Sequence, residues 1–286
     1  MESMDEPKGK IVREGPPVVR ERAAKTVLNR SKIGTYSLNC YLGCRHACVY
    51  CYARFMQRFH PHPEEWGEFV DVKVNAVEAL YRQLRRMEPG PVFVSSACDA
   101  YQPLEEEYGL TRRCARLLME YGFKVNVLTK STLVLRDLEM YAEKRLCRIG
   151  VTVTTPDAEA AAVWEPRVPP PEERFDVLRR AKEEGLETGV MFGPLLPEVS
   201  DDFESIDRLF ERAAQLDVDV IHTDCMNPRP RVWPSVRRLL AAEYPDLLGR
   251  YRDVLFDGEV REKYSDNVWK RVELAARRHG VSERLA

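Results

Sequence analysis

Six short apolar segments alternate with amphipathic segments along this chain of 286 residues. They predict strands at residues 36–42, 91–96, 124–130, 148–155, 187–195 and 218–224. Each strand but the last is followed by a predicted helix, at residues 73–87, 110–121, 136–145, 172–184 and 201–215. Strands that alternate with helices form parallel sheets. Six such units are too few for a closed eight-stranded barrel, so we expect an open, curved one.

The two ends of the chain lack this alternation. Residues 1–35 predict an extended N-terminal arm, in which only residues 21–29 could form a short helix. Residues 36–225 would form the barrel, and residues 226–286 a helical C-terminal extension with helices at 234–254 and 265–279. Residues 56–70 predict an irregular surface loop, which places His60 and His62 in solvent rather than at a metal.

Composition indicates in which compartment the protein works and which class of partner it could bind. No stretch of about twenty apolar residues occurs, so we expect no membrane span. The N-terminal sequence MESMDEPKGK lacks the apolar core of a signal peptide. We therefore expect a cytoplasmic protein whose eight cysteines are reduced. Residues 1–60 hold eleven Lys and Arg against five Asp and Glu. Such a basic segment either holds a polyanion or is simply solvated.

Cysteines gather in the stretch CYLGCRHACVYCYAR, directly after the first predicted strand. Cys44, Cys48 and Cys51 have the spacing C-x3-C-x2-C. Three thiolates on one tight loop can hold three irons of a [4Fe–4S] cluster, and the fourth iron then stays open to a substrate or cofactor. A Cys3His zinc site that includes His46 is the alternative, although zinc sites more often join two separated ligand pairs.

This run resembles the signature of the radical S-adenosylmethionine (SAM) superfamily, a C-x3-C-x-aromatic-C motif in which Tyr50 takes the aromatic position. The string GC-x-H-x-C-x-YCYA at residues 43–53 is similar, more narrowly, to the spore photoproduct lyase-like, or DNA repair photolyase-like, branch. Further matching strings stand at residues 94–113, 128–137, 165–167 and 189–197. The resemblance implies a partial (β/α)6 barrel of the TIM type, which agrees with the strand count.

The resemblance also implies where SAM binds. The lysine that ends the third strand would meet the SAM carboxylate, and polar residues that end the second strand would meet its ammonium group. Two threonines on one face of the fourth strand would bind the ribose, although threonine also favours strands for its shape alone. The aromatic residue of the motif and the fifth strand would meet the adenine. These cofactor-binding residues are Tyr50, Ser95, Ser96, Asp99, Lys130, Thr152, Thr154, Met191 and Gly193.

Two further residues are implied to act on the substrate. Cys98 replaces the branch's usual threonine, and in spore photoproduct lyase a cysteine at the end of this strand donates a hydrogen atom. Tyr52 matches a tyrosine that is proposed to relay the radical there. Either residue could instead simply pack. Substrate contacts are expected after the sixth strand, from His222, Asp224, Cys225, Asn227, Arg229 and Arg231. The other cysteines, Cys40, Cys114 and Cys147, are expected to be structural, with Cys40 at most a spare ligand.

The resemblance therefore implies an enzyme. A [4Fe–4S] cluster would cleave SAM reductively to a 5′-deoxyadenosyl radical that abstracts hydrogen from a substrate such as a nucleic-acid lesion or a modified base. A reductant such as a ferredoxin or flavodoxin is the implied partner. Small-molecule and peptide substrates stay open. So do two other function classes, an iron–sulfur electron carrier without SAM cleavage and a zinc-stabilised nucleic-acid-binding module.

Overall fold

The computed structural model describes residues 10–13, 17–227, 229 and 231–286. Within these residues, seven strands form one sheet in the order β11-β10-β9-β8-β7-β4-β3. Neighbours from β4 to β11 run parallel, and the edge strand β3 is antiparallel. The strands are β3 (Leu28–Arg30), β4 (Tyr36–Leu38), β7 (Pro91–Val94), β8 (Lys124–Thr129), β9 (Cys147–Val153), β10 (Glu187–Leu195) and β11 (Val220–Cys225). Because β3 and β11 do not pair with each other, the barrel is open, as predicted.

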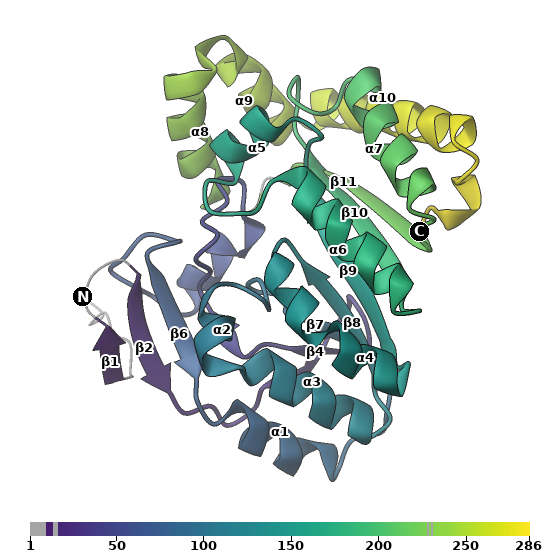
Figure 1. Ribbon diagram of the computed structural model, residues 1–286. Helices are drawn as coiled ribbons and strands as arrows, with labels where there is room; N and C mark the ends of the chain where they lie inside the picture. The colour runs from purple at the N-terminus through teal and green to yellow at the C-terminus, as the bar shows by residue number, and fades with distance from the viewer. Residues whose placement is uncertain (1–9, 14–16, 228, 230) are drawn as a thin grey trace.

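Helices cover the outer face of this sheet and bury its apolar side (Figure 1). Ile149, Val151 and Val153 alternate along β9 and are fully buried in the main core, whereas Thr152 between them belongs to the other face of the strand. Gly122 after α3 and Gly185 after α6 have positive φ, a conformation in which glycine ends a helix at little steric cost. The helices are α1 (Ala76–Leu84), α2 (Leu104–Tyr108), α3 (Leu110–Glu120), η2 (Thr132–Asp137), α4 (Leu138–Lys144), α5 (Ala158–Trp164), α6 (Pro171–Glu183) and α7 (Phe203–Gln215).

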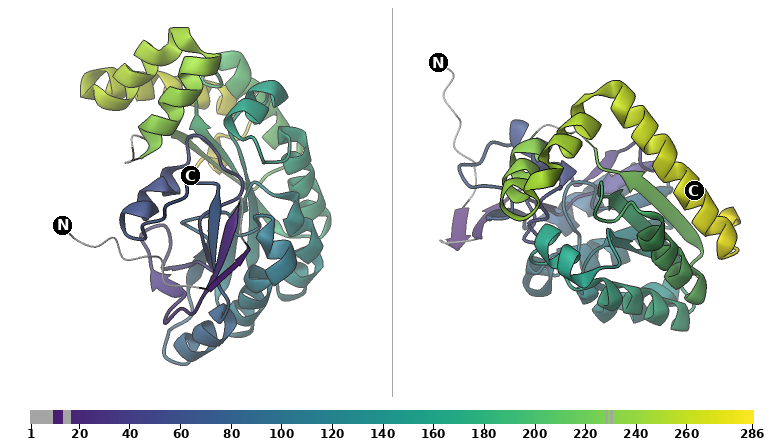
Figure 2. Two further views of the ribbon diagram at one scale, coloured as in Figure 1. Left: turned by 90° about the vertical axis from the view of Figure 1, so that its left-hand side faces the viewer. Right: turned by 90° about the horizontal axis from the view of Figure 1, so that it is seen from above.

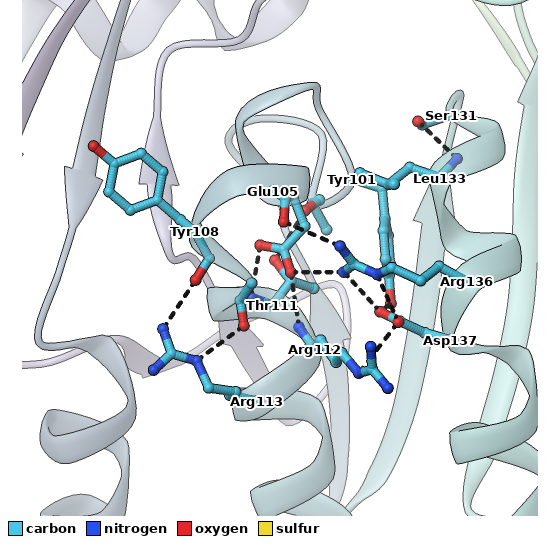
Figure 3. Close-up of polar contacts among 12 residues, drawn as sticks. Tyr101, Glu105, Tyr108, Thr111, Arg112, Arg113, Ser131, Leu133, Arg136 and Asp137 are labelled. Atoms are coloured by element: carbon cyan, nitrogen blue, oxygen red, sulfur yellow. Dashed lines mark hydrogen bonds and ion pairs between the residues drawn. The ribbon is translucent and has the colours of Figure 1, made fainter. Parts of the chain in front are cut away.

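A buried polar network fastens three of these helical segments together (Figure 3). The fully buried Glu105 of α2 accepts hydrogen bonds from the backbone N–H of Thr111, at 2.9 Å, and from the Tyr41 hydroxyl, at 2.5 Å. The Arg136 guanidinium of η2 lies 3.5 Å from Glu105 and 2.9 Å from Asp137. We call Tyr41, Glu105, Arg136 and Asp137 the frame network, because it joins α2, α3 and η2.

Two strands from the N-terminal segment and two strands that flank the cysteine loop form a second sheet, in the order β1-β2-β6-β5. Its strands are β1 (Lys10–Arg13), β2 (Val18–Arg22), β5 (Tyr41–Leu42) and β6 (Phe69–Lys73). The predicted helix at residues 21–29 is wrong, since this stretch ends β2 and enters β3. Val19 of β2 pairs in register with Val70 of β6. A local sequence pattern cannot predict a partner that lies so far along the chain. The predicted strand 36–42 likewise divides into β4 and β5, which belong to different sheets.

The predicted surface loop 56–70 also carries more structure than expected. It begins within the 3-10 helix η1 (Tyr52–Arg58) and ends within β6. His60 is exposed as predicted, but the side chain of His62 is fully buried. Its Nε2 atom lies 3.1 Å from Asp71, and its ring stacks on Phe69 with 3.8 Å between centroids. An aromatic stack and a carboxylate partner therefore draw His62 into the interior.

The C-terminal segment is helical, as predicted, with different boundaries. It comprises α8 (Val232–Glu243), η3 (Pro245–Leu247), α9 (Leu248–Phe256), α10 (Gly258–Arg278) and η4 (Ser282–Arg284). The single predicted helix 234–254 is wrong, because Pro245 begins a separate short turn after α8. Helix α10 packs along α7, and α8 and α9 stand over one end of the barrel (Figure 2). None of the helices in the described ranges is long and apolar enough to cross a membrane.

Candidate active site

The three clustered cysteines lie on a loop between β5 and η1, next to β6. Successive tight turns wind this loop: the N–H of Ala47 donates to the carbonyl of Cys44 at 3.3 Å, and the N–H of Cys51 donates to the carbonyl of Cys48 at 3.2 Å. Gly43 enters the loop with φ of 86°, and a Cβ there would stand 2.4 Å from the carbonyl oxygen of Phe69. Glycine is therefore required where the loop presses on β6.

Side chains and backbone from the barrel hold the same loop from the other side. The fully buried Gln102 accepts a hydrogen bond from the N–H of Arg45 at 3.0 Å and donates one to the carbonyl of Gly43 at 3.2 Å. The N–H of Val49 donates to the carbonyl of Trp164 at 3.0 Å. Contacts from the segments after β7 and β9 thus fix the beginning and the middle of the loop.

The thiols of this loop form a soft donor set. Cys44 and Cys48 are buried and Cys51 is partly buried. Burial raises the pKa of all three thiols, to about 12 for Cys48, where the charge of Lys130 opposes the rise. Residues 43–52 contain no carboxylate, and thiolates without oxygen donors suit iron–sulfur clusters and zinc. Among the described residues, no three Cys, His, Asp or Glu side chains are already arranged as a metal site, so the ligand assignment stays a prediction from spacing.

His46, the fourth ligand of the zinc alternative, faces another partner. Its Nδ1 atom lies 3.4 Å from Asp99, and its side chain is almost fully buried. Asp99 also accepts hydrogen bonds from the Thr129 hydroxyl at 2.6 Å and from the N–H of Lys130 at 2.7 Å. Burial acts to raise the pKa of Asp99, but His46 and these hydrogen bonds outweigh it and lower that pKa to about 2. Asp99 thus ties the cysteine loop to the end of β8.

The predicted residues at the end of β7 also contact one another. The Cys98 thiol lies 2.8 Å from the Ser95 hydroxyl, and Ser95 has φ of 71°. Ser96 accepts a hydrogen bond at its carbonyl oxygen from the Tyr52 hydroxyl, at 2.5 Å. Tyr52 is 44% exposed, so its hydroxyl is fixed while part of its ring stays open to solvent. The structure therefore places the two predicted catalytic residues, Cys98 and Tyr52, beside the two predicted serines.

A second buried network lies beneath Tyr50. The Tyr50 hydroxyl lies 2.8 Å from that of Thr154 and donates a short hydrogen bond to the Glu165 carboxylate. Glu165 accepts a hydrogen bond from Thr154 at 3.0 Å and pairs with Arg174. All four side chains are buried, and the ammonium of Lys130 stands over the Tyr50 ring, 5.7 Å from its centroid. We call Tyr50, Thr154, Glu165 and Arg174 the rim network.

Two members of the rim network, Glu165 and Arg174, are absent from the predicted site. The Glu165-Pro166-Arg167 string is recognisable in the sequence, but Tyr50 and Glu165 lie 115 positions apart. Thr154, predicted to bind ribose, here contacts Glu165 and the carbonyl of Gly193, the latter at 3.2 Å. Only the family string could have marked Glu165, and nothing in the local sequence marks Arg174 among the many arginines of the chain.

Three of the remaining predicted residues lie side by side on neighbouring strands. Thr152, Met191 and His222 are register partners on β9, β10 and β11, so they share one row. His222 and Asp224 are exposed, as substrate contacts would need to be. The other predicted contacts are the half-buried Cys225 and Asn227 and the exposed Arg229 and Arg231. Cys40 is fully buried and hydrogen-bonds Cys114, and Cys147 is buried in the core, which fits structural roles for all three.

An apolar cluster covers the loop from the C-terminal side. Cys48 and Tyr50 pack in one cluster with Trp164 and with buried residues of α8 and α9, including Val236 and Tyr251. On the opposite side, Cys44 packs with a smaller cluster that contains Phe69. Both clusters exclude water from the thiols, which strengthens electrostatic interactions at the loop.

Comparisons with known proteins agree with this geometry. The sequence model of the Radical SAM superfamily matches residues 38–210. An uncharacterised protein of Methanocaldococcus jannaschii is 33% identical over 180 residues, which cover 62% of this chain and 68% of that protein. An uncharacterised protein of Acidianus two-tailed virus is 31% identical over 217 residues, which cover 72% of this chain and 71% of that protein.

Among solved structures, a doubly substituted variant of spore photoproduct lyase with bound AdoMet and dinucleoside spore photoproduct has a similar fold. Its TM-score is 0.65 at 14% identity, and the match covers 90% of this chain and 79% of that one. The same lyase complexed with dinucleoside spore photoproduct gives a TM-score of 0.64 with the same identity and coverage. At this identity the likeness concerns the fold. Together with the superfamily match across more than half of the sequence, it identifies the chain as an enzyme of the radical SAM superfamily.

Proposed function

We propose that this enzyme holds a [4Fe–4S] cluster on Cys44, Cys48 and Cys51 and acts on a nucleic-acid lesion or a modified base. The observation that carries the proposal is the loop itself, in which three thiols lie between two apolar clusters and beside Lys130. When bound, the cluster and SAM would supply a 5′-deoxyadenosyl radical able to abstract hydrogen from an unactivated carbon. The residues of the chain would bind, orient and shield these groups.

Lys130 is the proposed partner of the SAM carboxylate. It follows β8 at the carboxyl edge of the parallel strands, where open sheets bind their ligands. Its backbone is fixed by Asp99 and its ammonium by the face of Tyr50. An ammonium group held beside the cysteine loop can bind a carboxylate through a charge-assisted hydrogen bond. Ser95, Ser96 and the row of Thr152 and Met191 stay the proposed contacts of the remaining polar groups and the adenosine of SAM.

Cys98 is the proposed hydrogen-atom donor to the substrate radical. Its S–H bond would break as the product's C–H bond forms. The O–H of Tyr52 would then return a hydrogen atom to the sulfur, which would leave the unpaired electron on the Tyr52 oxygen. Burial raises the pKa of the Cys98 thiol to about 12, so the thiol keeps its hydrogen at neutral pH. The sulfur also lies 3.6 Å from the carbonyl of Tyr41, which fixes its position.

The proposed nucleic-acid substrate is supported by the lyase-like fold and by the exposed residues at the carboxyl ends of the strands. Burial raises the pKa of Tyr52, and Arg229 lies near enough to oppose that rise. His222 and Asp224 are exposed on β11. All eight cysteines are free thiols, which supports a reducing compartment such as the cytoplasm. A ferredoxin or flavodoxin is the proposed electron donor.

Anaerobic reconstitution tests this proposal. We expect a brown protein with about four irons per chain that cleaves SAM to 5′-deoxyadenosine under dithionite. A brown protein without SAM cleavage would point to an electron carrier, and a colourless zinc protein would point to a structural module; either result contradicts the proposal.

The substrate is tested separately by isotope transfer. The probe is an oligonucleotide that contains a deuterated spore photoproduct. If this lesion is the substrate, deuterium should appear in 5′-deoxyadenosine. With Cys98→Ala, transfer to 5′-deoxyadenosine should persist while formation of repaired product falls. The absence of deuterium in 5′-deoxyadenosine would remove this lesion as the substrate and leave the radical SAM assignment intact.

A further inference from the structure

The buried pair of Glu165 and Arg174 has no role in the reaction as described so far. Glu165 closes α5 and Arg174 belongs to α6, and both side chains are 1% exposed. A buried ion pair costs desolvation that a pair of apolar side chains would avoid. Arg174 uses its other donors on the carbonyls of Thr152, at 3.0 Å, and Pro169, at 2.8 Å. Each of the three guanidinium nitrogens therefore has an acceptor, and Arg174 holds Glu165 in one orientation.

The carboxylate so oriented points at the cysteine loop. One of its oxygens accepts the hydroxyls of Tyr50 and Thr154, and the other accepts Arg174. Tyr50 stands between Cys48 and Cys51, and its ring carries the Lys130 ammonium on its face. A chain of direct contacts thus runs from Arg174 through Glu165 and Tyr50 to Lys130.

Electrostatics reinforces these contacts. Burial acts to raise the pKa of Glu165, but the charges of Arg174 and Lys130 and the hydrogen bond from Tyr50 outweigh it, and the pKa is lowered. The carboxylate therefore stays charged at neutral pH and attracts the Lys130 ammonium toward the Tyr50 ring. An apolar pair could join α5 to α6, but it could neither accept the Tyr50 hydroxyl nor attract Lys130.

We propose that Glu165, oriented by Arg174, is a positioning residue for SAM: it fixes the Tyr50 hydroxyl and thereby holds the Lys130 ammonium where the SAM carboxylate binds. The inference rests on the proposed function, because it takes Lys130 as the carboxylate partner. It assigns to Glu165 an effect on SAM affinity rather than on iron binding, because the carboxylate oxygens bond Tyr50, Thr154 and Arg174 rather than the thiols.

The variant Glu165→Gln tests whether the carboxylate is needed for SAM binding. Glu165→Gln keeps the size of the side chain but replaces one carboxylate oxygen with a donor amide. Because Tyr50 and Arg174 bond different oxygens, one of the two loses its acceptor in this orientation. SAM affinity, measured by equilibrium dialysis of the reconstituted protein, should fall about tenfold, the order expected for one charge-assisted hydrogen bond. Iron content and far-UV circular dichroism should match the wild type.

A double-mutant cycle shows whether Glu165 acts through Tyr50. Tyr50→Phe removes only the hydroxyl and should weaken SAM binding about as much as Glu165→Gln, and the double variant should lose little more than either single variant. The change that SAM causes in the electron paramagnetic resonance spectrum of the reduced cluster gives a second readout. In each variant it should appear only at about tenfold higher SAM than in the wild type.

The matched control is Glu105→Gln, which alters an equally buried glutamate of the frame network and should leave SAM affinity within about twofold of the wild type. Wild-type affinity in Glu165→Gln, or additive losses in the double variant, would overturn the inference. If Glu165→Gln does not fold, Tyr50→Phe decides alone, and unchanged affinity in that variant overturns it. A wild-type protein that takes up neither iron nor SAM would instead overturn the proposed function, and the inference with it.

Discussion

The frame network and the rim network are each built around a fully buried glutamate, yet the two glutamates ionise differently. Glu105 accepts backbone N–H groups at the start of α3, and burial raises its pKa despite those hydrogen bonds (Figure 3). Glu165 accepts only side chains, and Arg174 and Lys130 outweigh its burial, so its pKa is lowered. Neighbouring cations, more than depth, therefore decide the direction in which the pKa of a buried carboxyl group shifts.

The positions of the two networks explain this difference. The frame network joins helices that only have to stay together, and its single arginine is more than a quarter exposed. The rim network lies beneath the cysteine loop, where two cations converge on one carboxylate. A network that only supports the fold tolerates a carboxyl group with a raised pKa, whereas a site for a charged ligand gains from a carboxylate whose pKa is lowered.

The largest effect should separate the cysteines of the loop from those of the core. Cys48→Ala should lower iron from about four per chain to nearly none and abolish SAM cleavage. Cys147→Ala removes an equally buried thiol from β9 and should keep both, with a loss of about 1 kcal/mol in unfolding free energy. Iron analysis after anaerobic reconstitution measures this difference. Full iron in Cys48→Ala would contradict the assignment of the ligands.

The lysines at the two ends of β8, Lys124 at its start and Lys130 directly after it, give the next largest contrast. Lys130→Met should weaken SAM binding about 10- to 100-fold, because a charge-assisted hydrogen bond to the carboxylate is lost. Lys124→Met alters the opposite end of the same strand, where the lysine pairs with Glu187 at the surface. It should leave SAM binding within about twofold of the wild type. Equal losses in the two variants, measured by equilibrium dialysis, would remove the distinction between the ends of the strand.

Stability should respond most strongly at the frame network. Glu105→Gln leaves Arg136 and the start of α3 with one oxygen acceptor fewer and should cost about 2–4 kcal/mol in unfolding free energy. Asp176→Asn breaks an exposed pair with Arg179 and should change it by less than about 0.5 kcal/mol. Urea denaturation measures both. A small effect at Glu105 would show that the frame network contributes no more than a surface ion pair.

The smallest effect, the pH dependence, has opposite signs in the two networks. The raised pKa of Glu105 means that its contribution is full below about pH 4.5 and is lost as the pH rises. The lowered pKa of Glu165 means that its contribution is full above about pH 4.5 and is lost as the pH falls. The stability difference between wild type and each glutamine variant, measured from pH 3 to 7, should therefore slope in opposite directions. Parallel slopes would contradict the contrast on which the comparison rests.

The sequence predicts the part of this molecule whose contacts are local or repeated. The six parallel strands and their helices follow from periodicity, because β9 alternates Ile149, Val151 and Val153 toward the core. The cysteine spacing indicates the loop for the same reason, since its turns are local. The helix prediction for residues 21–29 is wrong because Glu21 and Arg22 pair with the distant strand β6. The prediction for His62 is wrong because its burial depends on Asp71 and Phe69 together.

The candidate site shows the same limit. The pattern places Lys130, Asp99 and Thr154 at strand ends, where the structure does gather them. It cannot show that the Asp99 carboxylate already accepts hydrogen bonds from Thr129 and from the backbone of Lys130. Nor can it show that Thr154 and Tyr50 both donate hydrogen bonds to Glu165. Burial and long-range pairing decide which polar groups remain available to a ligand, and neither is written into a local stretch of sequence.

The shape of the cysteine loop depends on ties that involve no metal. The pairing of β5 with β6 fixes the start of the loop, and Gln102 hydrogen-bonds its first turn. The carbonyl of Trp164 accepts a hydrogen bond from its middle. Zinc fingers, by contrast, fold only as the ion arrives. A cysteine loop that is folded before the cofactor binds can accept a cofactor assembled elsewhere, after synthesis of the polypeptide is complete. Oxygen damage to that cofactor should therefore leave a folded apoprotein into which a new cofactor can be inserted, rather than an unfolded chain that is degraded by proteases.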